Sequence, residues 1–324
     1  MAVLLTGGTG FVGLNVAEAL LARGLTVVLH ALDAVPDAAR AEFAKLPGRL
    51  IEIRGDARDT EALAALARTH GVQRAVYAAA ITAGPARERQ AAARILETNA
   101  VAAVALFQAL AGRLARFVFL SSVAVYGEAG YGRPETDESV EPVPDSLYAI
   151  SKHAVERSLR RLRDPVLGEA TCLRLGPVYG PWERDTGLRD TLSPPFAVLG
   201  HARAGRACVL PRPGLRDWVY ARDVGEGIAA ALLHEGPLAP VYNLSAGAPF
   251  TLEALGTEIA KRRPGFEVRV GAPANVDLYA PADRAPLSIA AIERDTGWRP
   301  RFSPATAVAD WLDWVERFPE FAPG

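Results

Sequence analysis

Two side chains four residues apart could carry acid–base chemistry on an alcohol: Tyr148 and Lys152. Ser146, just before them, is a candidate helix N-cap, which would place Tyr148 in the first helical turn. Positions i and i+4 share one helix face, so the ammonium and the positive helix end should both favour a tyrosinate. We expect the pKa of Tyr148 to fall below its reference of about 10, allowing the phenol to exchange a proton with an alcohol. The alternative interpretation is an amphipathic helix with an aromatic residue near its start.

Two serines could hold a reacting oxygen beside that tyrosine. Ser121 and Ser122 end an apolar run at 116–120 that predicts a β-strand. Active groups in open α/β sheets gather at the carboxyl ends of strands. One serine hydroxyl is therefore a candidate to orient the oxygen, and the other could simply cap the strand end.

A glycine-rich turn supplies the third chemical feature. Gly7, Gly10 and Gly13 lie between a short apolar run at 2–5 and a helical pattern at 11–23, and Phe11 and Val12 open that helix. Such a loop lets the backbone approach a pyrophosphate, whose charge the helix N-terminus binds. A plain structural turn is the alternative, but the strand–loop–helix context favours a dinucleotide site.

The elements that must position these residues alternate along the chain. Further strands are expected at 26–29, 49–53, 75–77, 116–120, 170–175 and 241–244, and helices at 36–45, 59–70, 87–112, 148–163 and 222–234. Short apolar strands alternating with helices predict an α/β fold: a doubly wound parallel sheet of the Rossmann type, covered on both faces.

The alternation loosens after Gly176, which predicts a second, smaller lobe towards the C-terminus. We expect residues 1–176, with about 221–243, to form the dinucleotide-binding domain. Residues 177–220 and 244–324 would form the substrate-binding lobe, with helices near 251–261, 288–296 and 304–317. The late strand at 241–244 would return to the sheet, so the two domains are not sequential in the chain.

Composition narrows the function class. A net charge of −1 over 324 residues argues against a nucleic-acid binder. Cys172 and Cys208 form no CxxC pair and the five histidines show no metal-binding spacing, so no metal is expected. Without a signal-peptide pattern or an apolar run of membrane-spanning length, we expect a soluble, cytoplasmic protein that engages no membrane.

Taken together, the motifs TGGTGFVG, SSVAVYG and YAISK resemble those of the extended short-chain dehydrogenase/reductase family, also called the NAD-dependent epimerase/dehydratase family. Their order and spacing match the family's. The resemblance implies that Ser122, four residues before Tyr126, orients the substrate oxygen, with Val123 beside the substrate. It implies that Tyr148 is the acid/base and that Lys152 tunes it and holds the nicotinamide ribose.

Weaker matches extend the resemblance over nearly the whole chain. They imply further cofactor contacts at Asp56, Ala57, Ala78, Ala79, Ala80, Asn99 and Pro177, and a substrate contact at Arg216. Two departures put a nucleotide-sugar substrate in doubt. Pro177 replaces an asparagine that often helps to bind such substrates, and Leu278 falls where the family has a pyrophosphate-binding arginine, with Arg284 closer to the C-terminal Gly-Trp pair.

Cofactor choice depends on the end of the second strand. The family's discriminating position falls at Ala31, and the nearby carboxylate is Asp33, which could reach the ribose hydroxyls. Arg40 belongs to the next predicted helix, and His30 is mostly uncharged at neutral pH. The charges favour NAD, with NADP as the alternative.

We therefore expect an NAD(P)-dependent oxidoreductase that transfers a hydride at a secondary alcohol or ketone carbon of a small sugar, sugar acid or hydroxy compound. One alternative is a nucleotide-sugar epimerase or dehydratase with tightly held NAD, and another is a non-catalytic nicotinamide sensor. Family members commonly dimerise through the helix at 87–112 and the YxxxK helix, and the widely spread apolar residues of 87–112 predict a homodimer here.

Overall fold

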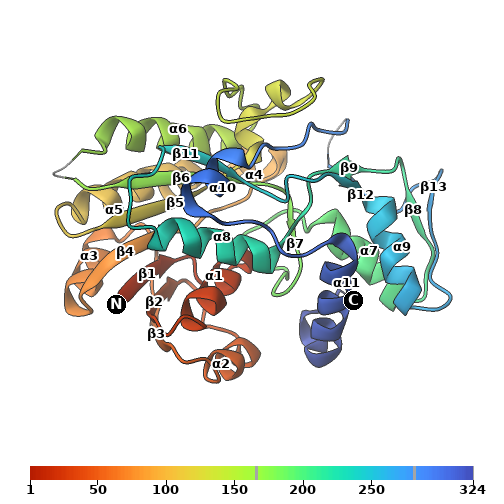
Figure 1. The fold of residues 1–324 in the computed structure, drawn as a ribbon, viewed down its shortest axis with the longest axis horizontal. Helices are drawn as coiled ribbons and strands as arrows, with labels where there is room; N and C mark the ends of the chain where they lie inside the picture. Colours follow the sequence, from red (N-terminus) through yellow and green to blue (C-terminus); the bar gives the residue numbers. More distant parts are fainter. Residues whose placement is uncertain (165–166, 280–281, 324) are drawn as a thin grey trace.

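A parallel β-sheet forms the centre of the computed structural model, which describes residues 1–164, 167–279 and 282–323. In this part of the chain the sheet has seven strands in the order β11-β6-β5-β4-β1-β2-β3 (Figure 1). The strands are β1 (Ala2–Thr6), β2 (Thr26–Ala31), β3 (Arg49–Arg54), β4 (Val72–Tyr77), β5 (Arg116–Ser122), β6 (Ala170–Leu175) and β11 (Val241–Leu244). The expected doubly wound α/β fold is confirmed.

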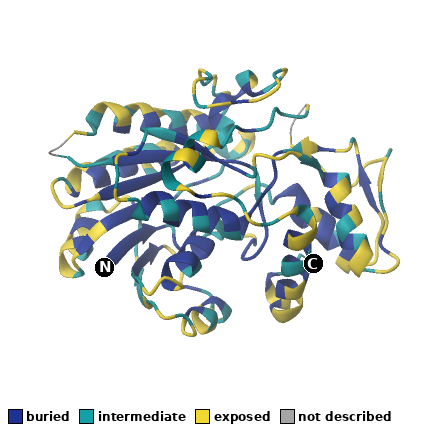
Figure 2. Cartoon of the chain, viewed as in Figure 1, coloured by how far each residue is buried: buried dark blue, intermediate teal, exposed yellow. Residues whose placement is uncertain are grey.

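Helices cover both faces of this sheet. One face packs against α1 (Phe11–Leu21), α2 (Asp37–Phe43) and α8 (Ala221–Leu233), and the other against α3 (Thr60–Thr69), α5 (Ala102–Ala109) and α6 (Leu147–Leu162). Because successive side chains of a strand point to opposite faces, β1 contributes to the hydrophobic core on each side of the sheet. Val3 and Leu5 pack on the side of α1 and α8, whereas Ala2 and Leu4 pack on the side of α3 and α5. Most of the central strands are buried, as the dark strands of Figure 2 show, and most of their buried residues are apolar; Arg74, Arg116 and Arg174 are buried exceptions.

The helix expected at 87–112 is interrupted. It consists of α4 (Pro85–Leu96), a π-helical turn (Glu97–Val101) and α5, with a further kink at Ala91, where φ is −135°. A π-turn inserts one residue per turn and so shifts the side chains that follow it around the helix axis. Asn99, in the middle of the turn, is fully buried as a result.

Outside the seven-stranded sheet, the later part of the chain, called the second lobe below, forms short strand pairs and helices and shares one hydrophobic core with α1 and α8. Its strands are β7 (Val178–Tyr179) with β10 (Val219–Tyr220), β9 (Leu215–Arg216) with β12 (Phe250–Thr251), and β8 (Cys208–Leu210) with β13 (Val268–Val270). Its helices are α7 (Pro194–Arg203), α9 (Leu252–Arg262) and α11 (Pro304–Arg317), at the right of Figure 1. Helix α10 (Ala290–Thr296) instead packs against α8 and β11, on the sheet domain.

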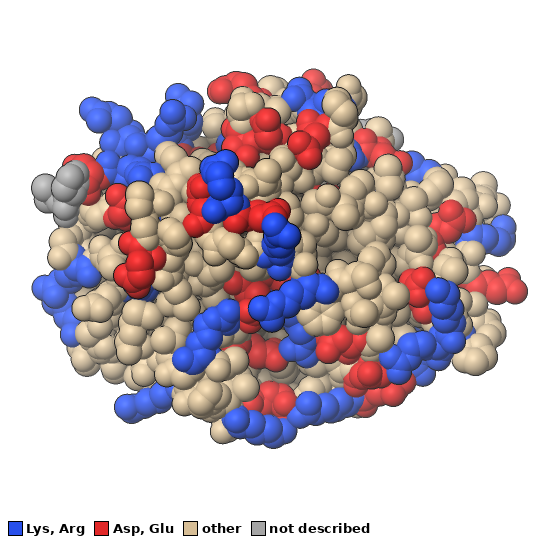
Figure 3. Space-filling view, in the orientation of Figure 1, with Lys and Arg blue, Asp and Glu red and all other residues tan. Residues whose placement is uncertain are grey.

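Short helical turns complete the chain at η2 (Val123–Tyr126), η3 (Glu128–Gly130) and η4 (Pro319–Phe321). Acidic and basic side chains interleave over most of the face shown in Figure 3. Basic groups gather over α6, whose later turns carry Arg157, Arg160 and Arg161. Among the described residues, no helix combines the length and apolarity that crossing a bilayer would require.

Candidate active site

A cavity of about 380 Å³ opens where the strands of the sheet end. Its lining takes residues that directly follow β1, β2, β3, β4, β5 and β6, together with the segment at 184–189 from the second lobe. Parallel strands place their carboxyl ends along one edge, so loops that are far apart in the sequence meet there.

Most of the residues singled out from the sequence lie in this lining. They are Gly7, Gly10, Phe11, Val12, Gly13, Asp33, Asp56, Ala57, Ala78, Ala79, Ala80, Ser122, Val123, Tyr148, Lys152 and Pro177. Asn99 and Arg216 are not part of it. The lining also contains His30, Thr82, Arg94, Arg184 and Arg189, which the sequence reasoning did not select as site residues.

The glycine loop fits a dinucleotide. Gly7 has φ of +66°, and a Cβ placed on it would lie 2.6 Å from the backbone of Ala79. A Cβ on Gly13 would lie 2.4 Å from the carbonyl oxygen of Gly7, so side chains are excluded at both positions. Helix α1 then begins with no side-chain cap and no acidic residue in its first turn. Its first N–H groups are left to an anion, which is what a pyrophosphate requires.

Tyr148 lies in the first turn of α6, whose N-cap is Ser146, with Oγ accepting from the backbone N–H of Ala149 at 3.3 Å. The pKa of Tyr148 is raised, and burial of the phenol is the main cause. Hydrogen bonds from the hydroxyls of Ser122 and Thr82, and the charge of Arg189, act in the opposite direction. The lowered pKa expected from the YxxxK spacing is therefore wrong, because spacing says nothing about desolvation.

Lys152 does not act on the phenol in the expected way either. Its Nζ donates to the carbonyl oxygen of Leu120 at 2.7 Å and lies 5.6 Å from the ring centroid of Tyr148. Burial lowers the pKa of Lys152 to about 7, although the carboxylate of Glu156 opposes that shift. A lysine that titrates near neutrality is a weaker electrostatic partner than the permanent cation assumed from the sequence.

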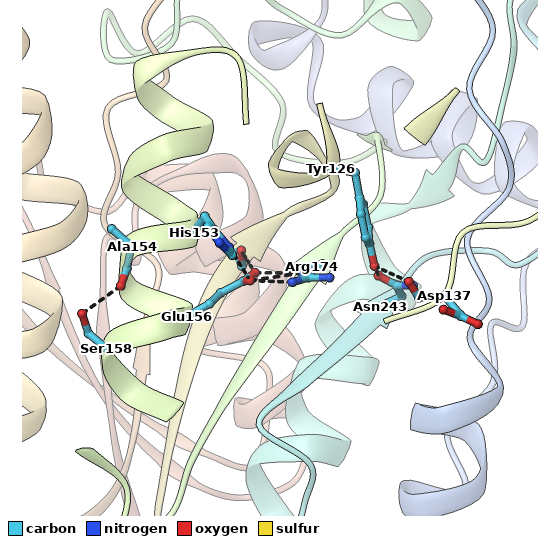
Figure 4. Close-up of polar contacts among 9 residues, drawn as sticks. Tyr126, Asp137, His153, Ala154, Glu156, Ser158, Arg174 and Asn243 are labelled. Carbon is cyan, nitrogen blue, oxygen red and sulfur yellow. Dashed lines mark hydrogen bonds and ion pairs between the residues drawn. The ribbon is translucent and has the colours of Figure 1, made fainter. Parts of the chain in front are cut away.

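Behind the reacting groups, a buried ion pair joins α6 to β6. Arg174 donates to Glu156 through Nη2 at 2.7 Å and Nε at 3.0 Å, and both side chains are almost fully buried (Figure 4). Ser121 Oγ donates to the same carboxylate at 2.5 Å. Both serines line the cavity, but Ser121 Oγ is committed to Glu156, so Ser122 is the better candidate to hold a substrate oxygen.

A neighbouring cluster fixes the segment that follows β5. Tyr126 donates its hydroxyl to Asn243 Oδ1 at 2.8 Å and to the backbone carbonyl of Asp137 at 3.0 Å (Figure 4). The guanidinium of Arg174 lies 4.6 Å from the Tyr126 ring centroid. The turn after Ser122 is therefore held from β6 and β11 together.

Asn99 acts from outside the cavity lining. Its Nδ2 donates to the carbonyl oxygen of Ile81 at 3.0 Å and to Ser151 Oγ at 3.2 Å, and its Oδ1 accepts from the Ile81 N–H at 2.8 Å. The amide therefore ties the loop after β4 to α6 without facing the cavity. The sequence predicted a cofactor contact for Asn99. In the structure, Asn99 lies in the π-turn and its amide binds the backbone of Ile81 in the loop after β4.

At the other end of the cavity, two carboxylates follow β2 and β3. Asp33 lines the cavity, and Asp56 is held by Arg58, whose guanidinium lowers the pKa of that carboxyl. His30 is buried here, and burial lowers the pKa of its imidazole. A neutral imidazole beside two carboxylates suits ribose hydroxyls better than a phosphate on the ribose.

A cationic cluster lies beside Val123 but outside the main cavity. Arg216 Nη2 donates to the carbonyl oxygen of Leu278 at 2.5 Å, and Arg284 donates to Tyr131 Oη at 3.0 Å and to the carbonyl oxygen of Val123 at 3.4 Å. Burial and the charge of Arg284 lower the pKa of Arg216 to about 10. The carboxylate of Asp283, which pairs with Arg212, acts against that shift and supplies a nearby counter-charge.

The five histidines and the acidic residues do not form a metal centre in the described ranges, where no three His, Cys, Asp or Glu side chains come close enough to hold an ion. The two cysteines are buried and unpaired with each other. The cavity lining itself offers the hydroxyls of Ser122 and Tyr148, the amine of Lys152 and the guanidinium groups of Arg184 and Arg189.

Comparison with known proteins agrees with this geometry. Residues 3–245 match the model of the NAD dependent epimerase/dehydratase family. The UDP-glucose 4-epimerase of Neisseria gonorrhoeae is 26% identical over 344 residues, covering 98% of each chain. A dTDP-glucose 4,6-dehydratase of Xanthomonas campestris is 26% identical, covering 96% of this chain and 92% of the relative.

A solved structure is similar over the same length. The Thermus thermophilus UDP-glucose 4-epimerase complex with NAD has a TM-score of 0.76 and 27% identity, covering 98% of this chain and 99% of that one. The family match spans three quarters of the chain and includes the glycine loop, the strand-end serines and the Tyr148–Lys152 pair. The chain belongs to the NAD-dependent epimerase/dehydratase family of enzymes.

Proposed function

We propose that this enzyme is a nucleotide-sugar epimerase that oxidises and then re-reduces one carbon of the sugar. The observation that carries the proposal is the pair Arg216 and Arg284, which lies outside the main cavity but next to it, because Arg284 donates to the carbonyl oxygen of Val123. Two guanidinium groups there suit the diphosphate that links a nucleoside to its sugar. A small neutral sugar would make no charge-assisted contact with these guanidinium groups.

Arg284 supports the proposal because it removes one of the two objections raised by the sequence. The family's arginine position is Leu278 here, but the carbonyl oxygen of that residue holds Arg216, and Arg284 reaches the same region from six positions further along the chain. In this proposal, Arg284 supplies the positive charge that the family's arginine would supply at position 278. Pro177 remains a departure, since it offers no side-chain donor.

Ser122, Tyr148 and Lys152 are proposed as the reacting set. Bound NAD supplies the hydride acceptor and later the hydride donor. Ser122 would orient the substrate hydroxyl, and Tyr148 would take its proton during oxidation and return it during re-reduction. Lys152, anchored on the carbonyl oxygen of Leu120, would hold the nicotinamide ribose beside them.

Epimerisation is favoured over dehydration by the positions of the carboxylates. Eliminating water from a keto sugar needs a further base and acid beside the sugar. Among the described residues that line the cavity, only Asp33 and Asp56 carry carboxylates, and they follow β2 and β3. Ser122 ends β5, three strand spacings from β2, or roughly 14 Å. Neither carboxylate is placed to act on a sugar held at Ser122.

Product analysis tests the proposal directly. The enzyme is incubated with UDP-glucose, UDP-galactose or dTDP-glucose, and the sugar is identified by NMR. We expect a mixture of epimers with no accumulation of NADH. Stoichiometric NADH with a free sugar or hydroxy acid would instead establish the simple dehydrogenase, and a deoxy keto sugar would establish the dehydratase.

The diphosphate contact has its own test. Arg284→Gln should raise KM for the nucleotide sugar by about tenfold or more, because one charge-assisted contact is lost. The Kd for NAD should stay the same, since Arg284 lies outside the cofactor cavity. An unchanged KM would remove Arg284 from the substrate site.

We further infer that the enzyme is a homodimer. Leu96, Val101 and Ile150 are exposed apolar residues on α4, the π-turn and α6, which are the elements expected at the dimer interface. Ile95 and Phe107 are buried in the chain's own core, so the apolar face open to a partner is narrower than the sequence suggested.

A further inference from the structure

Residues 182–190 form a strap that runs from the second lobe along the cofactor cavity. Its first residue, Trp182, has φ of +69°, which is uncommon for a bulky side chain. The indole is buried against Phe43 of α2 and against Trp314 and Phe321, and Nε1 donates to Glu18 at 2.9 Å. The start of the strap is therefore fixed to the domain that carries the glycine loop.

The far end of the strap is fixed as well. The N–H of Thr82 donates to the carbonyl oxygen of Leu188 at 3.0 Å, and the N–H of Asp190 donates to the carbonyl oxygen of Thr82 at 3.1 Å. The carboxylate of Asp190 accepts from the N–H of Gly84 at 2.7 Å and pairs with Arg87 at 2.5 Å. The start of the strap is thus held by α1 and α2, and its far end by the loop after β4, where Thr82 lines the cavity.

Arg184 lies between these two anchors, over the glycine loop. Its Nη2 donates to the carbonyl oxygen of Thr9 at 3.0 Å, while Nη1 is buried without a hydrogen-bond partner among the described residues. Leaving a buried charged donor unpaired is unfavourable, so the position calls for an anionic acceptor. Burial lowers the pKa of Arg184, and the nearby carboxylate of Asp33 acts against that shift.

Arg189, the other strap arginine in the lining, is already paired. Its Nη1 donates to Glu183 at 3.0 Å, and its guanidinium lies 5.8 Å from the Phe11 ring centroid. Arg184 differs from Arg189 in this respect. Its nearby carboxylate is Asp33, and no direct hydrogen bond joins the two side chains among the described residues. Gly10, Phe11, Val12 and Gly13, at the start of α1, line the same cavity as Arg184.

We propose that Arg184 binds a phosphate of the bound dinucleotide, so that the second lobe holds the cofactor together with the glycine loop. The inference depends on NAD being the family's cofactor and not on the epimerase reaction proposed above. It assigns cofactor affinity to a residue far in the sequence from the glycine loop.

The experiment measures binding to protein stripped of its cofactor. Kd is determined by calorimetry for NAD, NADP, ADP-ribose and adenosine with wild type, Arg184→Gln and Arg184→Lys. Arg206→Gln serves as the matched control, because Arg206 is an exposed arginine of the same lobe outside the cavity lining. Thermal unfolding of each stripped variant checks the fold.

We expect Arg184→Gln to raise Kd for NAD and ADP-ribose by about tenfold or more, and Arg184→Lys to raise it less. Adenosine, which has no phosphate, should bind all variants equally, and Arg206→Gln should match wild type. An equal loss for NAD and NADP identifies the diphosphate as the group bound, and a larger loss for NADP identifies the 2′-phosphate. Should the glutamine variant fail to fold, the lysine variant decides alone, by whether its Kd exceeds that of wild type.

Two results would overturn the proposal. Unchanged affinity for NAD and ADP-ribose in a folded Arg184→Gln would show that the guanidinium does not touch a phosphate. An equal loss of adenosine binding would show that Arg184 only holds the strap in place through Thr9.

Discussion

At the reacting end of the cavity, Tyr148 and Lys152 have different surroundings from those that their spacing implies. Tyr148 is buried beside the hydroxyls of Ser122 and Thr82, and its burial raises its pKa, while Lys152 is anchored on a backbone carbonyl. A phenol that keeps its proton at neutral pH is ready to act as the acid. For Tyr148 to act as the base, nearby positive charge must stabilise the tyrosinate. Arg189 contributes such charge and lowers the pKa of Tyr148.

Replacing the phenol tests its role. Tyr148→Phe should keep the fold and the affinity for NAD but lower kcat by about 100-fold or more, because only the proton-transfer group is removed. The measurements are epimer formation and calorimetric binding of NAD. An unchanged kcat would take Tyr148 out of the mechanism.

The lowered pKa of Lys152 predicts that the free energy of unfolding depends on pH. Its pKa in the fold is about 7, below the ordinary 10.5, so the fold disfavours the charged form. The cost of burying the charge is complete below about pH 7 and disappears as pH rises towards 10.5, where the unfolded chain also loses the proton. Relative to wild type, Lys152→Met should therefore be most favourable to stability below pH 7, and the difference should shrink with rising pH.

Urea unfolding of the two cofactor-free proteins between pH 6 and pH 10 measures this difference. A free-energy difference that does not change with pH would mean that the fold does not lower the pKa of Lys152. The same variant should bind NAD more weakly and turn over more slowly, because the lysine is proposed to hold the nicotinamide ribose.

At the scale of elements, the end of β5 depends on its neighbours. The carbonyl oxygen of Leu120 holds Lys152, Ser121 donates to Glu156, and Glu156 pairs with Arg174 of β6. One turn of α6 therefore separates the reacting lysine from the buried carboxylate that fixes the strand beneath it. Helix α6 and the two strands position Ser122 as one unit.

Breaking the ion pair should destabilise this unit. Glu156→Gln leaves the buried guanidinium of Arg174 without a counter-charge, and we expect a loss of about 3–5 kcal/mol in the free energy of unfolding. Denaturant unfolding measures the loss. The double variant Glu156→Leu with Arg174→Met should lose less than the sum of the two single changes, since no charge is left alone. Additive losses would argue against a coupled pair.

On the scale of the whole molecule, the two lobes meet along the cofactor cavity. The strap at 182–190 belongs to the second lobe but is anchored on α1, α2 and the loop after β4. Figure 1 shows α7, α9 and α11 to one side of the sheet, away from α4 and α6. The strap reaches α4 through the Arg87–Asp190 pair, whereas Val101 of the π-turn and Ile150 of α6 stay exposed.

The proposed dimer gives a prediction at this scale. Val101 is 62% exposed, so Val101→Glu should change the stability of the single chain very little. The buried charge should nevertheless prevent association through α4, the π-turn and α6. Light scattering at micromolar concentration should show a dimer for wild type and a monomer for the variant. A wild-type monomer would contradict the interface.

The alternating α/β fold, the glycine loop and the residues proposed for the reaction could be predicted from the sequence, because they depend on local patterns. Apolar periodicity sets strands and helices, and Gly7 and Gly13 are required where no side chain fits. Short spacing likewise puts Tyr148 and Lys152 on one turn of a helix.

Which charged side chains meet could be seen only in the folded chain. Arg184 comes within hydrogen-bond distance of Thr9 across 175 positions of the chain, and Arg284 reaches Val123 across 161. The direction of the pKa shift of Tyr148 and the inward turn of Asn99 were also beyond the sequence. The physical reason is that desolvation and charge–charge contacts depend on which distant segments pack together, and no local pattern records that.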